Sequence, residues 1–286
     1  MIKVYPSNNR YFVSTNWLEQ RLNDTKIRVI DASWYLPNVD RSGLKEYENR
    51  HIPGASFFDL DKFSDANSNL PHMALEEKIF SNKFESFGIL PNQIIIVYDG
   101  SGLFSSPRLL WLLHLYGFYN VFILDGGLPK WIAENRALTS EPSSINSSSF
   151  IPSVDLKLVC DWRKVKSFQT NKPKQVIDAR PSERFSGKVP EPRPGLRSGH
   201  IPGSTNICYK DLLNDNHTLK KNKKLLEIIH SKGIDLQLPI ITSCGSGVTA
   251  AILFLALEEL GVKDLAIYDG SWAEWGSRND LEIEIG

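Results

Sequence analysis

The chain contains two copies of one pattern, and this internal repeat limits its fold more than any other feature. Four segments of the first half return in the same order in the second half, 144 to 149 residues later. The pairs are 29–32 with 176–179, 51–54 with 200–203, 96–102 with 241–247, and 125–131 with 269–275. Ordered matches at nearly one spacing indicate two tandem copies of one domain.

The length of the chain agrees with this repeat. At about 150 residues per domain, 286 residues suit two domains with separate cores. Residues 139–149 are rich in serine and include a proline, a composition typical of a linker. We therefore predict a first domain at 1–138, a linker at 139–156 and a second domain at 157–286.

Each copy alternates short apolar runs with helical periodicity. Residues 94–97 and 238–242 are predicted to be strands buried on both faces, and helical stretches follow at 107–116 and 248–260. A strand, a loop, a helix and a further strand form a βαβ unit. We expect an α/β fold in which each copy has a mainly parallel sheet flanked by helices.

Charge and hydropathy exclude several classes of function. The chain has 33 Lys plus Arg and 33 Asp plus Glu, so no net field draws it to nucleic acid or an anionic membrane. No apolar run approaches the roughly 20 residues that span a bilayer, and we expect a soluble cytoplasmic protein. The three cysteines lie far apart and form neither a disulfide framework nor a metal site.

The loop that follows the predicted central strand shows one telling difference between the two copies. The first copy has Asp99 there and the second has Cys244. Ligands of parallel sheets bind beyond the carboxyl ends of strands, where this loop lies. Two glycines let the loop backbone curl, so that N–H groups and the positive end of the following helix favour a thiolate. We predict that Cys244 is a nucleophile whose pKa falls from about 8.5 toward about 3.5–7.5.

Other conspicuous residues have a structural interpretation. Cys160 and Cys208 are expected to be small buried hydrophobic residues, and His51 and His200 to form turns of the fold. Tryptophans near the repeated helices are expected in the core, namely Trp111, Trp131, Trp272 and Trp275. A cysteine phosphatase would need an arginine six positions after its cysteine, where this chain has Ala250.

These motifs resemble the rhodanese superfamily across essentially the whole chain. The resemblance rests on the doubled His-Ile-Pro-Gly, on the Cys-x-x-Gly-Val-Thr-Ala loop that begins at Cys244, and on the doubled Asp-Gly-x-x-x-x-Trp segment. The loop looks like that of the 3-mercaptopyruvate sulfurtransferase branch. The resemblance implies two tandem rhodanese-like domains, the first inactive with Asp99 and the second forming a persulfide on Cys244. It implies neither a metal nor an organic cofactor.

The resemblance also assigns residues to the substrate. Arg184 and Arg193 match the positions that grip the carboxylate and ketone of 3-mercaptopyruvate, and a guanidinium suits this bidentate task. Lys188 and Arg197 lie in the same segment and remain alternatives. The other residues expected to bind substrate are Gly245, Gly247, Val248 and Thr249. Thiosulfate sulfurtransferases have basic residues directly after the cysteine, whereas this loop is neutral, which favours a keto acid.

A proton relay is implied by the same resemblance. Ser246, His72 and Asp61 match a hydroxyl, histidine and aspartate proposed to act together near the cysteine, across the interface of the two domains. Such a relay would protonate the departing pyruvate enolate, a role that suits the histidine pKa of about 6.5. The expected acceptor is a thiol, such as thioredoxin, or cyanide. The alternatives are a thiosulfate:cyanide sulfurtransferase and a persulfide carrier without small-molecule turnover.

Overall fold

The structure is a computed structural model that describes residues 10–90, 92–143, 147–170 and 175–286. The described chain forms two compact units. Unit 1 comprises residues 10–63, 75–155 and 215–219, and unit 2 comprises 64–74, 156–214 and 220–286. Part of the predicted linker, residues 144–146, and the start of the chain lie outside the described residues.

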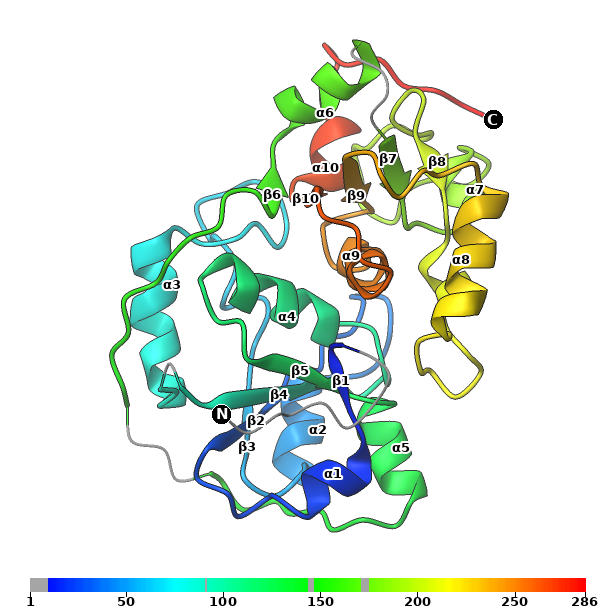
Figure 1. Ribbon diagram of the computed structural model, residues 1–286. Coiled ribbons are helices and arrows are strands. Elements are labelled where there is room, and N and C mark those ends of the chain that lie inside the picture. Colours follow the sequence, from blue (N-terminus) through cyan, green and yellow to red (C-terminus); the bar gives the residue numbers. More distant parts are fainter. Residues whose placement is uncertain (1–9, 91, 144–146, 171–174) are drawn as a thin grey trace. The chain divides into compact units, whose positions relative to one another are not determined.

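Unit 1 contains a parallel sheet of five strands in the order β1-β5-β4-β2-β3. The strands are β1 (Phe12–Val13), β2 (Ile27–Asp31), β3 (Ala55–Phe57), β4 (Ile94–Tyr98) and β5 (Val121–Leu124). The helices are α1 (Thr15–Glu19), α2 (Gly43–Asn49), α3 (Glu77–Phe84), the 3-10 turn η1 (Glu85–Phe87), α4 (Ser106–Leu115) and α5 (Gly127–Ala133). Within this unit, α4 covers one face of the sheet while α1, α2 and α5 cover the other (Figure 1).

Unit 2 repeats the same topology in the order β6-β10-β9-β7-β8. The strands are β6 (Val159–Cys160), β7 (Gln175–Asp178), β8 (Thr205–Asn206), β9 (Ile240–Ser243) and β10 (Leu265–Tyr268). The helices are α6 (Trp162–Thr170), α7 (Ser182–Phe185), the 3-10 turn η2 (Tyr209–Leu212), α8 (Asn222–Ser231), α9 (Ala250–Glu259) and α10 (Ser271–Trp275). Within unit 2, α9 lies on one face of the sheet and α6 and α10 on the other (Figure 1). The predicted α/β fold in two copies is confirmed.

Burial explains why the central elements form. Helices cover both faces of each sheet, so the central strands are buried on both sides. Strand β4 is apolar along most of its length, and all four residues of β9 are buried, although its last two, Thr242 and Ser243, are polar. All ten residues of α4 and the first eight of α9 are buried, as the predicted buried helix requires. The four tryptophans near the repeated helices are fully buried, which confirms their place in the core. Among the described helices, none is long and apolar enough to cross a membrane, and the cytoplasmic location stays a prediction.

Candidate active site

The loop between β9 and α9 holds Cys244 at the carboxyl end of the sheet, only 2% exposed. Its backbone N–H donates to Ser271 Oγ at 3.2 Å, and this hydroxyl donates to the Tyr268 carbonyl at 2.8 Å. Ser271 has a φ of +49°, and its counterpart in unit 1, Gly127, has +53°. A serine in this left-handed conformation is strained by about 1–3 kcal/mol. The hydroxyl of this strained serine holds the backbone of Cys244.

Unit 1 shows what kind of group this loop binds. The Asp99 carboxylate occupies the position equivalent to Cys244 and is fully buried. Its Oδ1 accepts from the Ser101 N–H at 2.8 Å, while Oδ2 accepts from the N–H groups of Phe104, Ser105 and Ser106 at 2.8, 3.1 and 2.9 Å. Oδ2 also accepts from Ser106 Oγ at 2.6 Å. In unit 1 the loop is therefore an anion nest that contains its own anion.

The corresponding loop of unit 2 has Cys244 in place of the Asp99 carboxylate. When the repeat is aligned, Cys244 corresponds to Asp99. The backbone N–H groups that correspond to the first three amide donors around Asp99 in chain order are those of Ser246, Thr249 and Ala250. Gly247 has a φ of +80°, and its equivalent in unit 1, Gly102, has +98°, so both loops have a left-handed glycine at this position. A thiolate or persulfide at Cys244 can take the place that the carboxylate takes in unit 1.

Ser246 is the centre of a buried hydrogen-bond cluster. Its Oγ lies 3.0 Å from His72 Nδ1 and accepts from the Arg193 guanidinium at 3.4 Å. His72 and Ser246 are both buried. The histidine belongs to the segment 64–74 of unit 2, so the structure brings three of the predicted site residues together beside the Cys244 loop.

The segment that carries His72 is anchored to unit 2 directly after the histidine. The Ala74 N–H donates to Asp269 Oδ2 at 2.7 Å, and Asp269 follows strand β10. His72 has a φ of +61°, an uncommon conformation for a residue other than glycine. Asp269 was part of the repeat, but the sequence carries no signal that it fixes this segment, because the partner lies 195 residues away.

Arg184, at the end of α7, lies against Gly245. A Cβ added at Gly245 would be 3.0 Å from Arg184 Nη2, so the guanidinium occupies the space beside the loop backbone. The Glu191 carboxylate accepts from Arg184 Nε at 3.2 Å and from Nη2. Arg184 and Arg193 are therefore placed on two neighbouring residues of the loop, Gly245 and Ser246.

A chain of buried ion pairs leads to Arg184, and sequence reasoning did not find it. Asp178 at the end of β7 pairs with Arg180 at 2.8 Å, and Arg180 Nη1 donates to Glu191 at 2.8 Å. The side chains of these three residues are 1–2% exposed. Burial alone would lower the pKa of Arg180, but its contacts with Asp178 and Glu191 outweigh burial and raise it. The only sequence signal was the acidic residue inside the Pro-Glu-Pro-Arg-Pro segment.

The remaining candidates take different places. Arg197 donates to the carbonyls of Gly276, Leu281 and Trp275 at 3.1, 2.9 and 3.0 Å, and to that of Arg278. Its guanidinium thus fastens the C-terminal segment, which makes it a structural residue rather than the alternative clamp. Lys188 is exposed.

Asp61 belongs to unit 1 and is exposed. Both of its carboxylate oxygens lie 3.2 Å from Trp34 Nε1. Its part in a relay with His72 stays a prediction.

The other two cysteines lie outside the loop between β9 and α9. Burial raises the pKa of Cys160 to about 12 and also raises the pKa of the half-buried Cys208. A raised pKa keeps both as thiols at neutral pH. The predicted burial is confirmed for Cys160, whereas Cys208 is only partly buried because it lies at the edge of the 3-10 turn η2.

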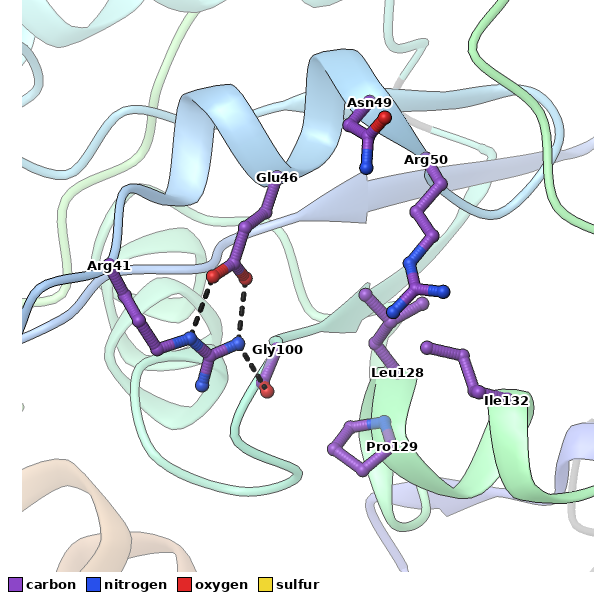
Figure 2. Close-up of a pocket in the computed structure, with 8 residues that line it drawn as sticks. All are labelled: Arg41, Glu46, Asn49, Arg50, Gly100, Leu128, Pro129 and Ile132. Carbon is purple, nitrogen blue, oxygen red and sulfur yellow. Dashed lines mark hydrogen bonds and ion pairs between the residues drawn. The ribbon is translucent and has the colours of Figure 1, made fainter.

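Unit 1 also has a pocket of about 340 Å³ beside Gly100, the residue after Asp99. Figure 2 shows Arg41 facing Glu46, and Arg50 reaching toward the apolar side chains of α5. Arg41 pairs with Glu46 at 2.7 Å, so these two charges neutralise each other. The lining residues are Arg41, Glu46, Asn49, Arg50, Gly100, Leu128, Pro129 and Ile132. None of these lining residues has a nucleophilic side chain.

Comparison with known proteins agrees with the repeat and the loop. The rhodanese-like domain matches twice, at residues 14–134 and 162–278. The chain belongs to the rhodanese family. These two rhodanese matches lie inside the predicted domains, whose finer boundaries, 1–138 and 157–286, stay predictions.

Individual relatives cover nearly the whole rhodanese chain. It is 40% identical to the 3-mercaptopyruvate sulfurtransferase of Escherichia coli (strain K12) over 96% of this chain and 98% of that protein. It is 37% identical to the thiosulfate sulfurtransferase of Rattus norvegicus over 96% and 95%. The crystal structure of SseA from Escherichia coli, described with the 3-mercaptopyruvate sulfotransferases, matches with a TM-score of 0.85, 38% identity and coverage of 92% and 98%. The 3-mercaptopyruvate and thiosulfate sulfurtransferases named above differ little in their identity to this chain, so identity alone does not distinguish between the two sulfur donors.

Proposed function

We propose that this protein is a sulfurtransferase that moves the sulfur of 3-mercaptopyruvate through a persulfide on Cys244 to a thiol acceptor, releasing pyruvate. One observation carries the choice of donor. Two guanidinium groups, those of Arg184 and Arg193, lie beside the uncharged residues Gly245 and Ser246 of the cysteine loop. This arrangement suits a donor with one carboxylate, which needs a planar cationic partner beside the loop rather than cations within it.

In the first half-reaction the Cys244 thiolate attacks the sulfur of the donor. A sulfur–sulfur bond forms, the carbon–sulfur bond breaks, and its electron pair stays on carbon as pyruvate enolate. Protonation of that carbon gives pyruvate. Ser246 and His72, which lie 3.0 Å apart, are the groups that move this proton. We keep Asp61 as the predicted third member of this relay.

In the second half-reaction an acceptor thiolate attacks the outer sulfur of the persulfide. The acceptor becomes a persulfide and Cys244 is released as a thiolate, which gives ping-pong kinetics. The loop amides stabilise the Cys244 persulfide, as the equivalent amides bind the Asp99 carboxylate in unit 1. A dithiol such as thioredoxin is our proposed acceptor, and cyanide would replace it in an assay.

The test compares turnover of 3-mercaptopyruvate and thiosulfate at matched concentrations, with a dithiol and with cyanide. Cys244→Ser should abolish turnover, whereas Cys208→Ser, the matched control at a half-buried cysteine, should retain it. A preference for 3-mercaptopyruvate of about a hundredfold, roughly 2.7 kcal/mol in transition-state binding, is expected. Activity that survives in Cys244→Ser would refute the scheme.

Two other functions give different results in the same assay. A thiosulfate:cyanide sulfurtransferase, as the relative from Rattus norvegicus is named, would prefer thiosulfate. A persulfide carrier would take no sulfur from either free donor and would not need Arg184 and Arg193 at the loop.

A further inference from the structure

The Glu191 carboxylate lies between Arg180 and Arg184 and accepts hydrogen bonds from both guanidinium groups. Its Oε1 accepts from Arg180 Nη1 at 2.8 Å and from Arg184 Nε at 3.2 Å, while its Oε2 accepts from Arg184 Nη2. Arg180 is itself fixed to Asp178 and to the Gly199 carbonyl at 2.8 Å. Arg180, which is itself held by Asp178 and Gly199, therefore fixes the Glu191 carboxylate that contacts Arg184.

The contact with Glu191 uses only one edge of the Arg184 guanidinium. The Nε and Nη2 groups form that edge, and Nη1 with the second proton of Nη2 forms another. Nη2 is the atom nearest to the Cβ position of Gly245, at 3.0 Å, with Nη1 at 3.9 Å. A carboxylate on one edge thus leaves the other edge available for a bidentate ligand beside the loop.

We propose that Glu191 is a positioning residue that holds the Arg184 guanidinium in the orientation that binds the carboxylate of the sulfur donor. This inference rests on the proposed function. Glu191 acts through Arg184 and is not placed against the substrate itself. Its side chain is 2% exposed, whereas that of Arg184 is 20% exposed, so the buried partner fixes the more accessible one.

An electrostatic role and a positioning role of Glu191 predict opposite changes in donor binding when its carboxylate is removed. If Glu191 acted only as a nearby negative charge, its removal would strengthen binding of an anionic donor, because one repulsive charge would disappear. If Glu191 positions Arg184, its removal weakens binding, because the guanidinium loses its bidentate partner and becomes free to rotate. The direction of the change in KM therefore separates the two effects.

The experiment measures kcat and KM for 3-mercaptopyruvate in two variants of the full chain. Glu191→Gln keeps the length of the side chain and removes its charge. Glu191→Asp keeps the charge but is one methylene too short to span both arginines. We expect each variant to raise KM about tenfold with kcat within about twofold of the unaltered protein. Glu183→Gln, at an exposed glutamate next to Arg184, is the control and should leave KM unchanged.

Two results would overturn the proposal. A KM that falls or stays constant in Glu191→Gln would show that the carboxylate acts as a charge or not at all. A KM for Glu191→Asp equal to that of the unaltered protein would show that the bidentate span is not needed. Thermal unfolding of each variant separates lost folding from lost positioning, since a folded fraction below one lowers the apparent kcat and leaves KM unchanged.

Failure of the proposed function looks different. In that case the unaltered protein has no turnover with 3-mercaptopyruvate, or Cys244→Ser keeps it. If the unaltered protein turns over the donor and only the variants behave unexpectedly, the positioning role alone is refuted.

Discussion

Asp31 in unit 1 and Asp178 in unit 2 occupy equivalent positions of the repeat, and we expect opposite effects when each is replaced by asparagine. Asp31 accepts from the Ser33 N–H at 2.8 Å and from Ser33 Oγ, with no arginine at the place that Arg180 takes in unit 2. Burial raises the pKa of Asp31 from 3.8 to about 6. Asp178 instead pairs with Arg180 at 2.8 Å.

The expected change in the free energy of unfolding in Asp31→Asn follows from the raised pKa of Asp31. Between pH 3.8 and about 6 the folded state binds more protons than the unfolded state, so the free energy of unfolding falls as the pH rises through this window. Above that window the buried Asp31 charge lowers the free energy of unfolding of the unaltered protein by about 3 kcal/mol. Asp31→Asn has no charge to bury. Its gain in stability should therefore grow from about 1 kcal/mol at pH 4.5 to about 3 kcal/mol at pH 8.

Urea unfolding at pH values from 4.5 to 8, compared between variant and unaltered protein, measures this gain. Hydrogen exchange of peptides from β2 and β4 assigns the change to unit 1. The matched variant Asp178→Asn breaks a buried ion pair and should lose about 3–5 kcal/mol at every pH, with exchange faster in β7 and β9. A gain in Asp31→Asn that is equal at pH 4.5 and pH 8 would refute the reasoning.

Three further outcomes are expected. Arg193→Lys should raise KM for 3-mercaptopyruvate about tenfold, because an ammonium cannot replace the planar fork; a KM that does not change would exclude Arg193 from the clamp. Ser271→Ala should lower kcat about tenfold, because the Cys244 N–H loses its acceptor; an unchanged kcat in steady-state assays would show that this hydrogen bond is only structural. Asp99→Ala should lower the melting temperature seen by calorimetry, because five loop donors lose their acceptor, and added sulfate should restore part of it; equal melting temperatures would contradict the anion nest.

The order of elements could be predicted because the repeat is local and its spacing is regular. The predicted strand 94–97 became β4 (Ile94–Tyr98), and the predicted helix 248–260 became α9 (Ala250–Glu259), a start two residues later. That difference arises because the residues before Ala250 belong to the loop that holds Cys244. Cys244 was singled out because it stands where the first copy has Asp99, and its role as the nucleophile stays a prediction.

The surroundings of Cys244 could be predicted only in part. Ser246, Arg184 and Arg193 lie near the cysteine loop as expected from the resemblance. Glu191 was missed because an ion pair between side chains seven residues apart depends on the turn of the chain, which no periodicity describes. Ser271 was missed because its conformation is visible only through its backbone dihedral.

If Cys244 carries sulfur as proposed, the built-in carboxylate of unit 1 limits the number of sulfur atoms that one chain can hold. With Asp99 bonded to its own loop, unit 1 has neither a thiolate to load nor free amides to stabilise a sulfur anion. Although the two loops are similar, we therefore expect one sulfur atom per chain. A fully loaded chain treated with excess cyanide should release one thiocyanate, and mass spectrometry should record a single addition of one sulfur atom.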